Sequence, residues 1–188
     1  MRIITEQEKQ RRVLLHKEKE PIVLKKLKQF NPRLFPFIQE KPNLLSDPLH
    51  SCYLFGKPRA RKTTQVMKQV LQWFEVRCID HNWFFTDFEI ITFSDLLCEL
   101  KNTFTDNKSK EVIEKYRRAK LLVIDDMGSV EVKDWSYTLL YMIIDYRYSQ
   151  MMTTFYTSNF TPDQLLTQSG DERLCRRIFD DCQIIECE

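Results

Sequence analysis

Residues 121–128, with the sequence LLVIDDMG, constrain the fold of this chain more than any other stretch. A short continuous apolar run that ends in charge is typical of a buried strand in a parallel sheet, and such sheets bind ligands beyond the carboxyl ends of their strands. Burying a carboxylate is costly unless it is paired or holds a cation. Asp125 and Asp126 are therefore predicted to hold magnesium or to supply a general base, although the pair could instead cap the helix that follows.

A phosphate-binding loop is predicted upstream of this strand. Residues 52–55 form a second short apolar segment, and a helical pattern runs over 64–74. A strand, a tight loop, Lys-Thr and a helix are the layout in which backbone N–H groups and a helix N-terminus bind phosphate. Lys62 would then reach the outer phosphates, and the Thr63 hydroxyl would bind magnesium. The candidate loop consists of Gly56, Lys57, Pro58, Arg59, Ala60, Arg61, Lys62, Thr63 and Thr64.

Two arginines in this loop depart from the usual pattern. The pattern GxxxxGK[ST] requires glycine at position 61 and often has glycine at position 59, but both are arginine here. Glycine is used because the backbone needs permissive dihedral angles and must approach the phosphate closely. The loop could therefore bind phosphate in an altered geometry or have lost binding, and a simple basic turn before an amphipathic helix is the alternative.

The length and composition of the chain predict one soluble globular domain. The 188 residues, 43% hydrophobic and 30% charged, suffice for one well-formed core. We expect a nucleotide-binding domain over 51–188 after a helical extension and proline-rich connector over 1–50, with the helix at 6–30 interrupted at Pro21. No apolar run approaches the ~20 residues of a membrane span, so no membrane association and a cytoplasmic location are expected. The six cysteines lack a CxxC pair and are expected to be thiols rather than zinc ligands.

Strands and helices are predicted to alternate through the rest of the chain, which favours a parallel sheet. Further strands are expected at 88–92, 153–158 and 183–185. Helices are expected at 94–104 with Ser94 as the cap, at about 110–118, at 135–148, from 161 onward and at 171–179. Residues 77–87 read as an irregular insertion loop.

Basic and aromatic side chains alternate along the two helices predicted between residues 94 and 118. Such a pattern suits a single-stranded nucleic acid, because cations contact the phosphates and rings stack on bases. Phe104 and Tyr116 could equally belong to the core. The candidate nucleic-acid contacts are Lys101, Phe104, Lys108 and Lys110.

Polar residues late in the chain supply two more candidates. Asn159 follows the predicted strand 153–158 and could orient an attacking water or cap the next helix. Arg177, with Arg173 nearby, could act as an arginine finger that stabilises phosphoryl charge in the site of a neighbouring subunit. The alternative for Arg173 and Arg177 is that they are ordinary surface arginines.

The chain from residue 51 to its C-terminus resembles the DnaC-type helicase loaders and the IstB-type transposition ATPases of the AAA+ class. The segments that carry the resemblance are FGKPRARKTT, KNTF, KLLVIDDMG, TSNFT and DERLCRRI, in this order. The resemblance implies an α/β fold of the P-loop NTPase type, an ASCE parallel sheet flanked by helices. It also implies ATP and Mg2+ as cofactors, single-stranded DNA, a DnaB-type replicative helicase or a transposase as partners, and assembly into a homo-oligomer.

The same resemblance implies a role for each site residue. Lys62 and Thr63 become the phosphate and magnesium residues, and Asp125 the Walker B magnesium carboxylate. Asp126 occupies the catalytic base position, Asn159 the sensor 1 position and Arg177 the arginine finger position.

Three features depart from the family pattern. Arg61 replaces a loop glycine, Asp126 is one methylene shorter than the usual glutamate, and the N-terminal segment has no zinc-ligand pattern. An ATP-binding helicase loader acting in DNA replication is the leading prediction. The alternatives are a non-hydrolysing P-loop adaptor or helicase inhibitor and an IstB-like partner of a transposase. Whether ATP is hydrolysed stays open.

Overall fold

Five parallel strands form a single sheet at the centre of the computed structural model, which describes residues 5–38, 47–79, 87–106, 109–132 and 134–188. The strand order is β2-β3-β4-β1-β5, so β4 lies between the two strands that lead into the predicted phosphate and magnesium residues. This arrangement confirms the predicted parallel α/β fold. The strands are β1 (Ser51–Phe55), β2 (Phe88–Thr92), β3 (Leu121–Met127), β4 (Thr154–Ser158) and β5 (Cys182–Glu186).

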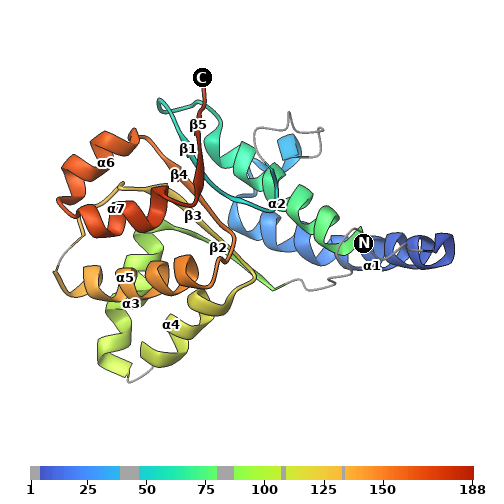
Figure 1. Ribbon diagram of the computed structural model, residues 1–188, viewed down its shortest axis with the longest axis horizontal. Coiled ribbons are helices and arrows are strands. Elements are labelled where there is room, and N and C mark those ends of the chain that lie inside the picture. The colour runs from blue at the N-terminus through green and yellow to red at the C-terminus, as the bar shows by residue number, and fades with distance from the viewer. Residues whose placement is uncertain (1–4, 39–46, 80–86, 107–108, 133) are drawn as a thin grey trace.

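Helices cover both faces of the sheet (Figure 1). One face packs against α1 (Glu6–Phe30), the short 3-10 helix η1 (Phe35–Ile38) and α2 (Lys62–Ile79). The other face packs against α3 (Phe93–Asp106), α4 (Ser109–Arg118), α5 (Asp134–Ser149), α6 (Pro162–Ser169) and α7 (Glu172–Phe179).

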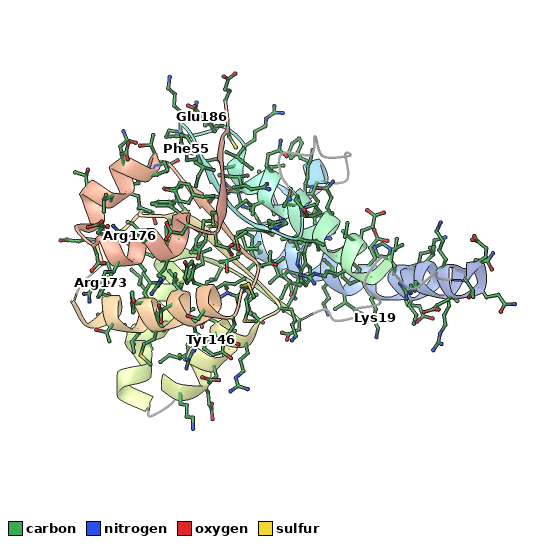
Figure 2. All side chains as sticks on the ribbon, in the orientation of Figure 1. Lys19, Phe55, Tyr146, Arg173, Arg176 and Glu186 are labelled. Carbon is green, nitrogen blue, oxygen red and sulfur yellow. The ribbon has the colours of Figure 1, made fainter. Side chains whose placement is uncertain are left out.

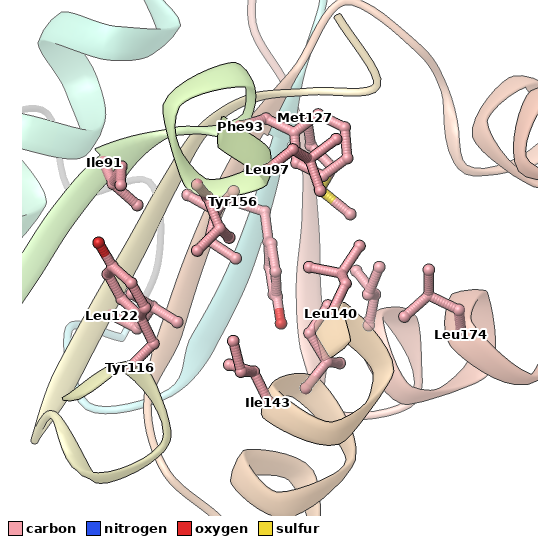
Figure 3. Packing of buried hydrophobic residues seen from close by; sticks show 14 of the residues in the cluster. Ile91, Phe93, Leu97, Tyr116, Leu122, Met127, Leu140, Ile143, Tyr156 and Leu174 are labelled. Atoms are coloured by element: carbon pink, nitrogen blue, oxygen red, sulfur yellow. The ribbon is translucent and has the colours of Figure 1, made fainter. Parts of the chain in front are cut away.

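The alternation of side chains along each strand produces two apolar cores. Leu121 and Val123 of β3 point toward α2, while Leu122 and Ile124 point toward α3 and α5. Figure 3 shows the second core, in which Tyr156 of β4 lies among leucine and isoleucine side chains. Because β3 is buried on both faces, its sequence is continuously apolar until it reaches Asp125.

Helix α1 runs without a break through Pro21, so the predicted interruption is wrong. Val23 and Leu27 on its C-terminal half are fully buried in the same core as β1 and α2, and this packing holds the helix together despite the missing N–H. The part of α1 that precedes Lys19, near the middle of the helix, projects beyond the sheet (Figure 2). The division of the chain at residue 50 stays a prediction.

Other element boundaries differ in detail from those expected. Helix α2 continues to Ile79, so the predicted loop cannot begin at residue 77, and residues 80–86 of that loop lie outside the described residues. Helix α3 is capped by Thr92 rather than Ser94, because Thr92 Oγ1 accepts the backbone N–H of Asp95 at 3.1 Å. No described helix has the length and hydropathy needed to cross a membrane.

Arg147 is a buried cation that joins α4, α5 and the sheet. Its side chain is 1% exposed, and its guanidinium donates to the Thr154 hydroxyl and to backbone carbonyls, including Tyr116, Ala119 and Thr153. Two of these carbonyls lie at the C-terminal end of α4, where helical carbonyls lack intrahelical partners. Burial lowers the pKa of Arg147 to about 10. No local sequence pattern indicates this role for Arg147.

Candidate nucleotide-binding site

A cleft of about 490 Å³ opens where the carboxyl ends of β1, β3 and β4 meet. Its volume lies in the range of small-molecule sites, roughly 300–1,000 Å³. Most of the predicted phosphate and magnesium residues share this cleft although they are far apart in the sequence. The lining residues are Leu34, Pro58, Arg59, Arg61, Lys62, Thr63, Thr64, Thr92, Ser94, Asp125, Asp126, Thr157 and Asn159.

The loop between β1 and α2 keeps the backbone shape that glycine normally provides. Arg59 and Arg61 have φ values of 74° and 54°, in the left-handed region that L-residues rarely adopt. Such a conformation costs about 1–2 kcal/mol for a non-glycine residue. Gly56 is required for another reason: a Cβ there would lie 2.2 Å from the carbonyl oxygen of Cys187. The arginines therefore strain the loop, which keeps a left-handed backbone at both positions.

Lys62 is fixed by three acceptors at the mouth of the loop. Its Nζ donates to the carbonyls of Gly56 and Lys57, both at 2.8 Å, and to Asn159 Oδ1 at 2.9 Å. Burial lowers the pKa of Lys62, while the nearby Cys187, Asp126 and Asp125 act in the opposite direction. A phosphate could bind Lys62 only by replacing at least one of these three acceptors, because an ammonium group has three donors.

Asp125 lies directly beside Thr63, as the sequence predicted. Thr63 Oγ1 is 2.9 Å from Asp125 Oδ1 and 3.1 Å from Oδ2. Burial raises the pKa of Asp125, and the hydrogen bonds from Thr157 and Thr63 oppose that rise. A buried carboxylate whose donors are neutral hydroxyls, next to a loop that can hold phosphate, fits Mg2+, which uses one or two carboxylates and keeps the remaining positions for phosphate and water.

Thr157 is a site residue that the sequence analysis missed. Its hydroxyl donates to Asp125 Oδ1 at 2.6 Å and accepts the backbone N–H of Asp126 at 2.9 Å. One hydroxyl on β4 therefore positions both acidic residues of β3. Threonine is common in strands, so its presence in β4 is not by itself a sign of function. The one available signal was its position at the end of the strand, two residues before Asn159.

Asp126 and Asn159 form the second half of the site. Asp126 has φ 60°, and the β3–β4 pairing shifts register between Ile124 and Met127. Such a bulge re-aims a side chain. Asn159 Nδ2 donates to Asp126 Oδ1 at 3.0 Å, while Asn159 Oδ1 accepts Lys62. Asn159 thus links the loop lysine to the candidate base.

The helix-capping alternatives for these residues are wrong. Helix α5 begins at Asp134, well beyond Asp126, so the acidic pair does not cap it. Helix α6 is capped by Thr161, whose side chain forms a capping box with Gln164. The polar side chains of Asp125, Asp126 and Asn159 are therefore available to the cleft.

Arg177 is not among the described residues that line the cleft. Its Nε donates to Asp145 Oδ1 at 2.8 Å, and its guanidinium carbon is 4.6 Å from the centre of the Tyr148 ring. The exposed Arg173 lies 3.9 Å from a carboxylate oxygen of Asp171. A role for either arginine in the cleft of a neighbouring subunit stays a prediction.

The predicted nucleic-acid contacts are only partly described. Lys101 and Lys110 are exposed on α3 and α4. Lys108 and the side chain of Phe104 lie outside the described part of the structure. Tyr116 cannot stack on a base, because it is 1% exposed and its hydroxyl donates to Glu99 at 2.6 Å. The core alternative is therefore correct for Tyr116.

Comparisons with known proteins agree with this geometry. The family model described as "IstB-like ATP binding protein" matches residues 85–187, just over half of the chain. The replicative helicase loader DnaI of Bacillus subtilis (strain 168) is 30% identical over 77 residues, which cover 40% of this chain and 25% of DnaI. The matched stretch of DnaI is thus only a quarter of that protein.

Two solved structures share the fold. The DnaC helicase loader superposes with a TM-score of 0.62 at 20% identity, covering 82% of this chain and 86% of that one. The replication initiator DnaA bound to AMPPCP and single-stranded DNA gives a TM-score of 0.61 at 17% identity, covering 86% and 49%. The parallel sheet and its flanking helices are therefore a fold that this chain shares with the DnaC helicase loader and with DnaA.

Proposed function

This chain belongs to the IstB-like family of ATP-binding proteins, and from that premise we propose that it binds Mg-ATP and acts in DNA replication as a helicase-loader-like protein. The observation that supports the proposal is the meeting of Lys62, Thr63 and Asp125 in one cleft. The family match begins at residue 85, so the proposed phosphate loop at 56–64 is supported by its sequence and geometry and not by that match.

Each site residue would take one part in binding and turnover. Backbone N–H groups at the start of α2 and the Lys62 ammonium would hold the triphosphate. Thr63 and Asp125 would hold Mg2+, which supplies charge neutralisation to the phosphates when bound. Asp126, oriented by Asn159, would accept a proton from the attacking water. Arg59 and Arg61, which also line the cleft, add positive charge next to the phosphates.

The roles of Lys62 and Asp126 are tested by nucleotide titration and by single-turnover hydrolysis. Lys62→Ala should weaken ATP binding at least about tenfold, because it removes a charge-assisted contact of the ground state. Asp126→Asn should keep binding and reduce turnover at least about a hundredfold. Lys57→Ala is the matched control, since only the backbone carbonyl of Lys57 contacts Lys62. Equal loss of binding in Lys62→Ala and Asp126→Asn would contradict the division of roles.

A second candidate function is an adaptor or helicase inhibitor that binds ATP without hydrolysing it. The strained backbone at Arg59 and Arg61 and the three acceptors already on Lys62 favour it. Arg61→Gly distinguishes the two. Turnover by the unmodified chain excludes the adaptor, whereas turnover that appears only in Arg61→Gly supports it.

Binding of a replicative helicase and of single-stranded DNA is part of the leading proposal. The chain, tagged and purified, should recover a DnaB-type helicase in the presence of ATP. Recovery of a transposase and no helicase would instead favour an IstB-like partner of a transposase. The absence of both would end the proposal that this chain loads a helicase.

A further inference from the structure

A second polar cavity of about 390 Å³ lies at the opposite end of the sheet from the nucleotide cleft. Lys120 directly precedes β3, and Thr153 directly precedes β4, so the cavity opens at the amino ends of these strands. Figure 2 shows this separation: Tyr146 lies far from Phe55 and Glu186, which mark the carboxyl ends of β1 and β5. We call it the basic cavity; its lining residues are Arg77, Arg118, Lys120, Tyr146, Gln150, Met151, Met152 and Thr153.

Three cations and no carboxylate appear among the described lining residues of the basic cavity. Carboxylates outside the lining act on two of these cations: Glu114 pairs with Arg118, and also with the neighbouring Arg117, while the charge of Asp47 acts on Arg77. The charge of Asp87 acts on the buried Arg147. Within the described part of the chain, the cations named here nevertheless outnumber the carboxylates. The cations are Arg77, Arg117, Arg118, Lys120 and Arg147, and the carboxylates are Asp47, Asp87 and Glu114.

Arg147 adds positive charge from beneath the cavity. Its Nη2 donates to the carbonyl of Thr153, a lining residue, at 2.6 Å. The other partners of its guanidinium are the Thr154 hydroxyl and the carbonyls of Tyr116 and Ala119. These oxygens are neutral, so they satisfy the donors of Arg147 without cancelling its charge. A buried charge is screened less than a surface charge, and its field therefore extends into the neighbouring cavity.

The walls of the basic cavity also offer apolar and aromatic surface. Tyr146 contributes an aromatic ring, one side of which is covered by the Arg117 guanidinium at 4.2 Å. Met151 is 85% exposed at the rim. Cations beside an aromatic ring and a flexible apolar side chain suit a nucleic-acid strand, which presents phosphates and flat bases together. A free phosphate ion would use only the cations and would leave most of this volume unused.

We propose that the basic cavity binds the phosphate backbone of a single-stranded nucleic acid, at a site distinct from the nucleotide cleft and from Lys101 and Lys110 on α3 and α4. The charge on Arg118 and Lys120 attracts the phosphates, and Tyr146 lies where a base could stack. The proposal rests on the single-stranded DNA binding proposed above but not on ATP binding, since the two cavities share no lining residue.

The test measures binding of a fluorescent oligothymidylate of about 16 nucleotides by anisotropy over a range of salt concentrations. Arg118→Gln with Lys120→Gln should weaken binding at least about fivefold at low salt. The slope of log affinity against log salt should become shallower by about 1.4, or 0.7 for each lost phosphate contact. Lys120→Arg, which keeps the charge, should bind as the unmodified chain does.

Arg176→Gln is the matched control, because Arg176 is exposed and pairs with Glu172 as Arg118 pairs with Glu114, one helical turn away. It should leave binding unchanged. Lys62→Ala should also leave DNA binding unchanged, so failure of the nucleotide site and failure of the basic cavity give different results.

Three outcomes would overturn the proposal. The first is that the unmodified chain fails to bind the oligonucleotide at low salt. The second is that the double variant and Arg176→Gln lose affinity equally. The third is that inorganic phosphate and an acidic peptide bind the cavity while the oligonucleotide does not. Thermal unfolding of each variant shows whether a lost affinity reflects a lost fold.

Discussion

Arg61 shows how a residue that breaks a sequence pattern can leave the local structure intact. Its φ of 54° is the conformation that glycine would adopt without cost. The sequence identified the departure from the pattern but not its consequence, because a sequence does not show whether neighbouring contacts hold a strained backbone in place. Here two hydrogen bonds join Lys62, directly after the strained residue, to the carbonyls of Gly56 and Lys57 before it, and a third joins Lys62 to Asn159.

Arg61→Gly should stabilise the protein. Removing the left-handed strain gains about 1–2 kcal/mol, part of which is lost because glycine makes the unfolded chain more flexible. Urea denaturation should therefore show a gain of about 0.5–1 kcal/mol. Lys57→Gly, in the same loop but without a positive φ, should lower stability by a similar amount. Equal effects of the two glycines would show that Arg61 is not strained.

Asp125→Asn should also stabilise the protein without ligand, by about 1 kcal/mol near neutral pH, a size typical of gains at active sites. Burial raises the pKa of Asp125 above its ordinary 3.8, so ionising it costs more in the folded protein than in the unfolded chain. That cost is absent below the ordinary pKa and is fully present above the raised one.

The gain from Asp125→Asn should therefore shrink as the pH falls toward the ordinary pKa of aspartate. Unfolding free energies measured across this range check the sign. A gain that grows with acidity would mean that Asp125 has a lowered pKa, as expected for a carboxylate in an ion pair.

Secondary-structure elements were predicted best where a single local pattern decides them. Strands β1 and β3 were correctly placed because a strand buried on both faces is continuously apolar. The interruption predicted in α1 at Pro21 was wrong, because the burial of Val23 and Leu27 stabilises the helix more than the proline destabilises it. That burial depends on residues distant in the sequence. Thr157 and Arg147 were missed for the same reason: their partners lie on other elements.

Arg147 is expected to be the main polar link between α4, α5 and β4. Arg147→Ala would leave several buried carbonyls without a donor. Each such carbonyl costs about 1–3 kcal/mol, so the free energy of unfolding should fall by about 3–5 kcal/mol. Arg176→Ala, an exposed arginine on α7, should change it by less than about 0.5 kcal/mol. A loss below about 1 kcal/mol in Arg147→Ala would mean that water replaces the guanidinium.

At the scale of the whole molecule, the order of elements along the chain was more informative than any single motif. The loop before α2, the acidic end of β3 and the polar end of β4 are each weak signals, yet a parallel sheet brings all three to one edge. The sequence thus predicted which residues meet. It could not predict the bonding inside the site, where Asn159 joins Lys62 to Asp126, because that depends on the register shift in β3.

The most direct test of this account is a calorimetric titration of ATP, with Mg2+ and with EDTA, into the unmodified chain, Asp125→Asn and Lys62→Ala. We expect Mg2+ to strengthen ATP binding to the unmodified chain at least about tenfold. Asp125→Asn should lose that gain while it keeps metal-free binding. Lys62→Ala should weaken ATP binding both with Mg2+ and with EDTA. Binding that ignores Mg2+ and both substitutions would contradict a nucleotide site formed by Lys62 and Asp125.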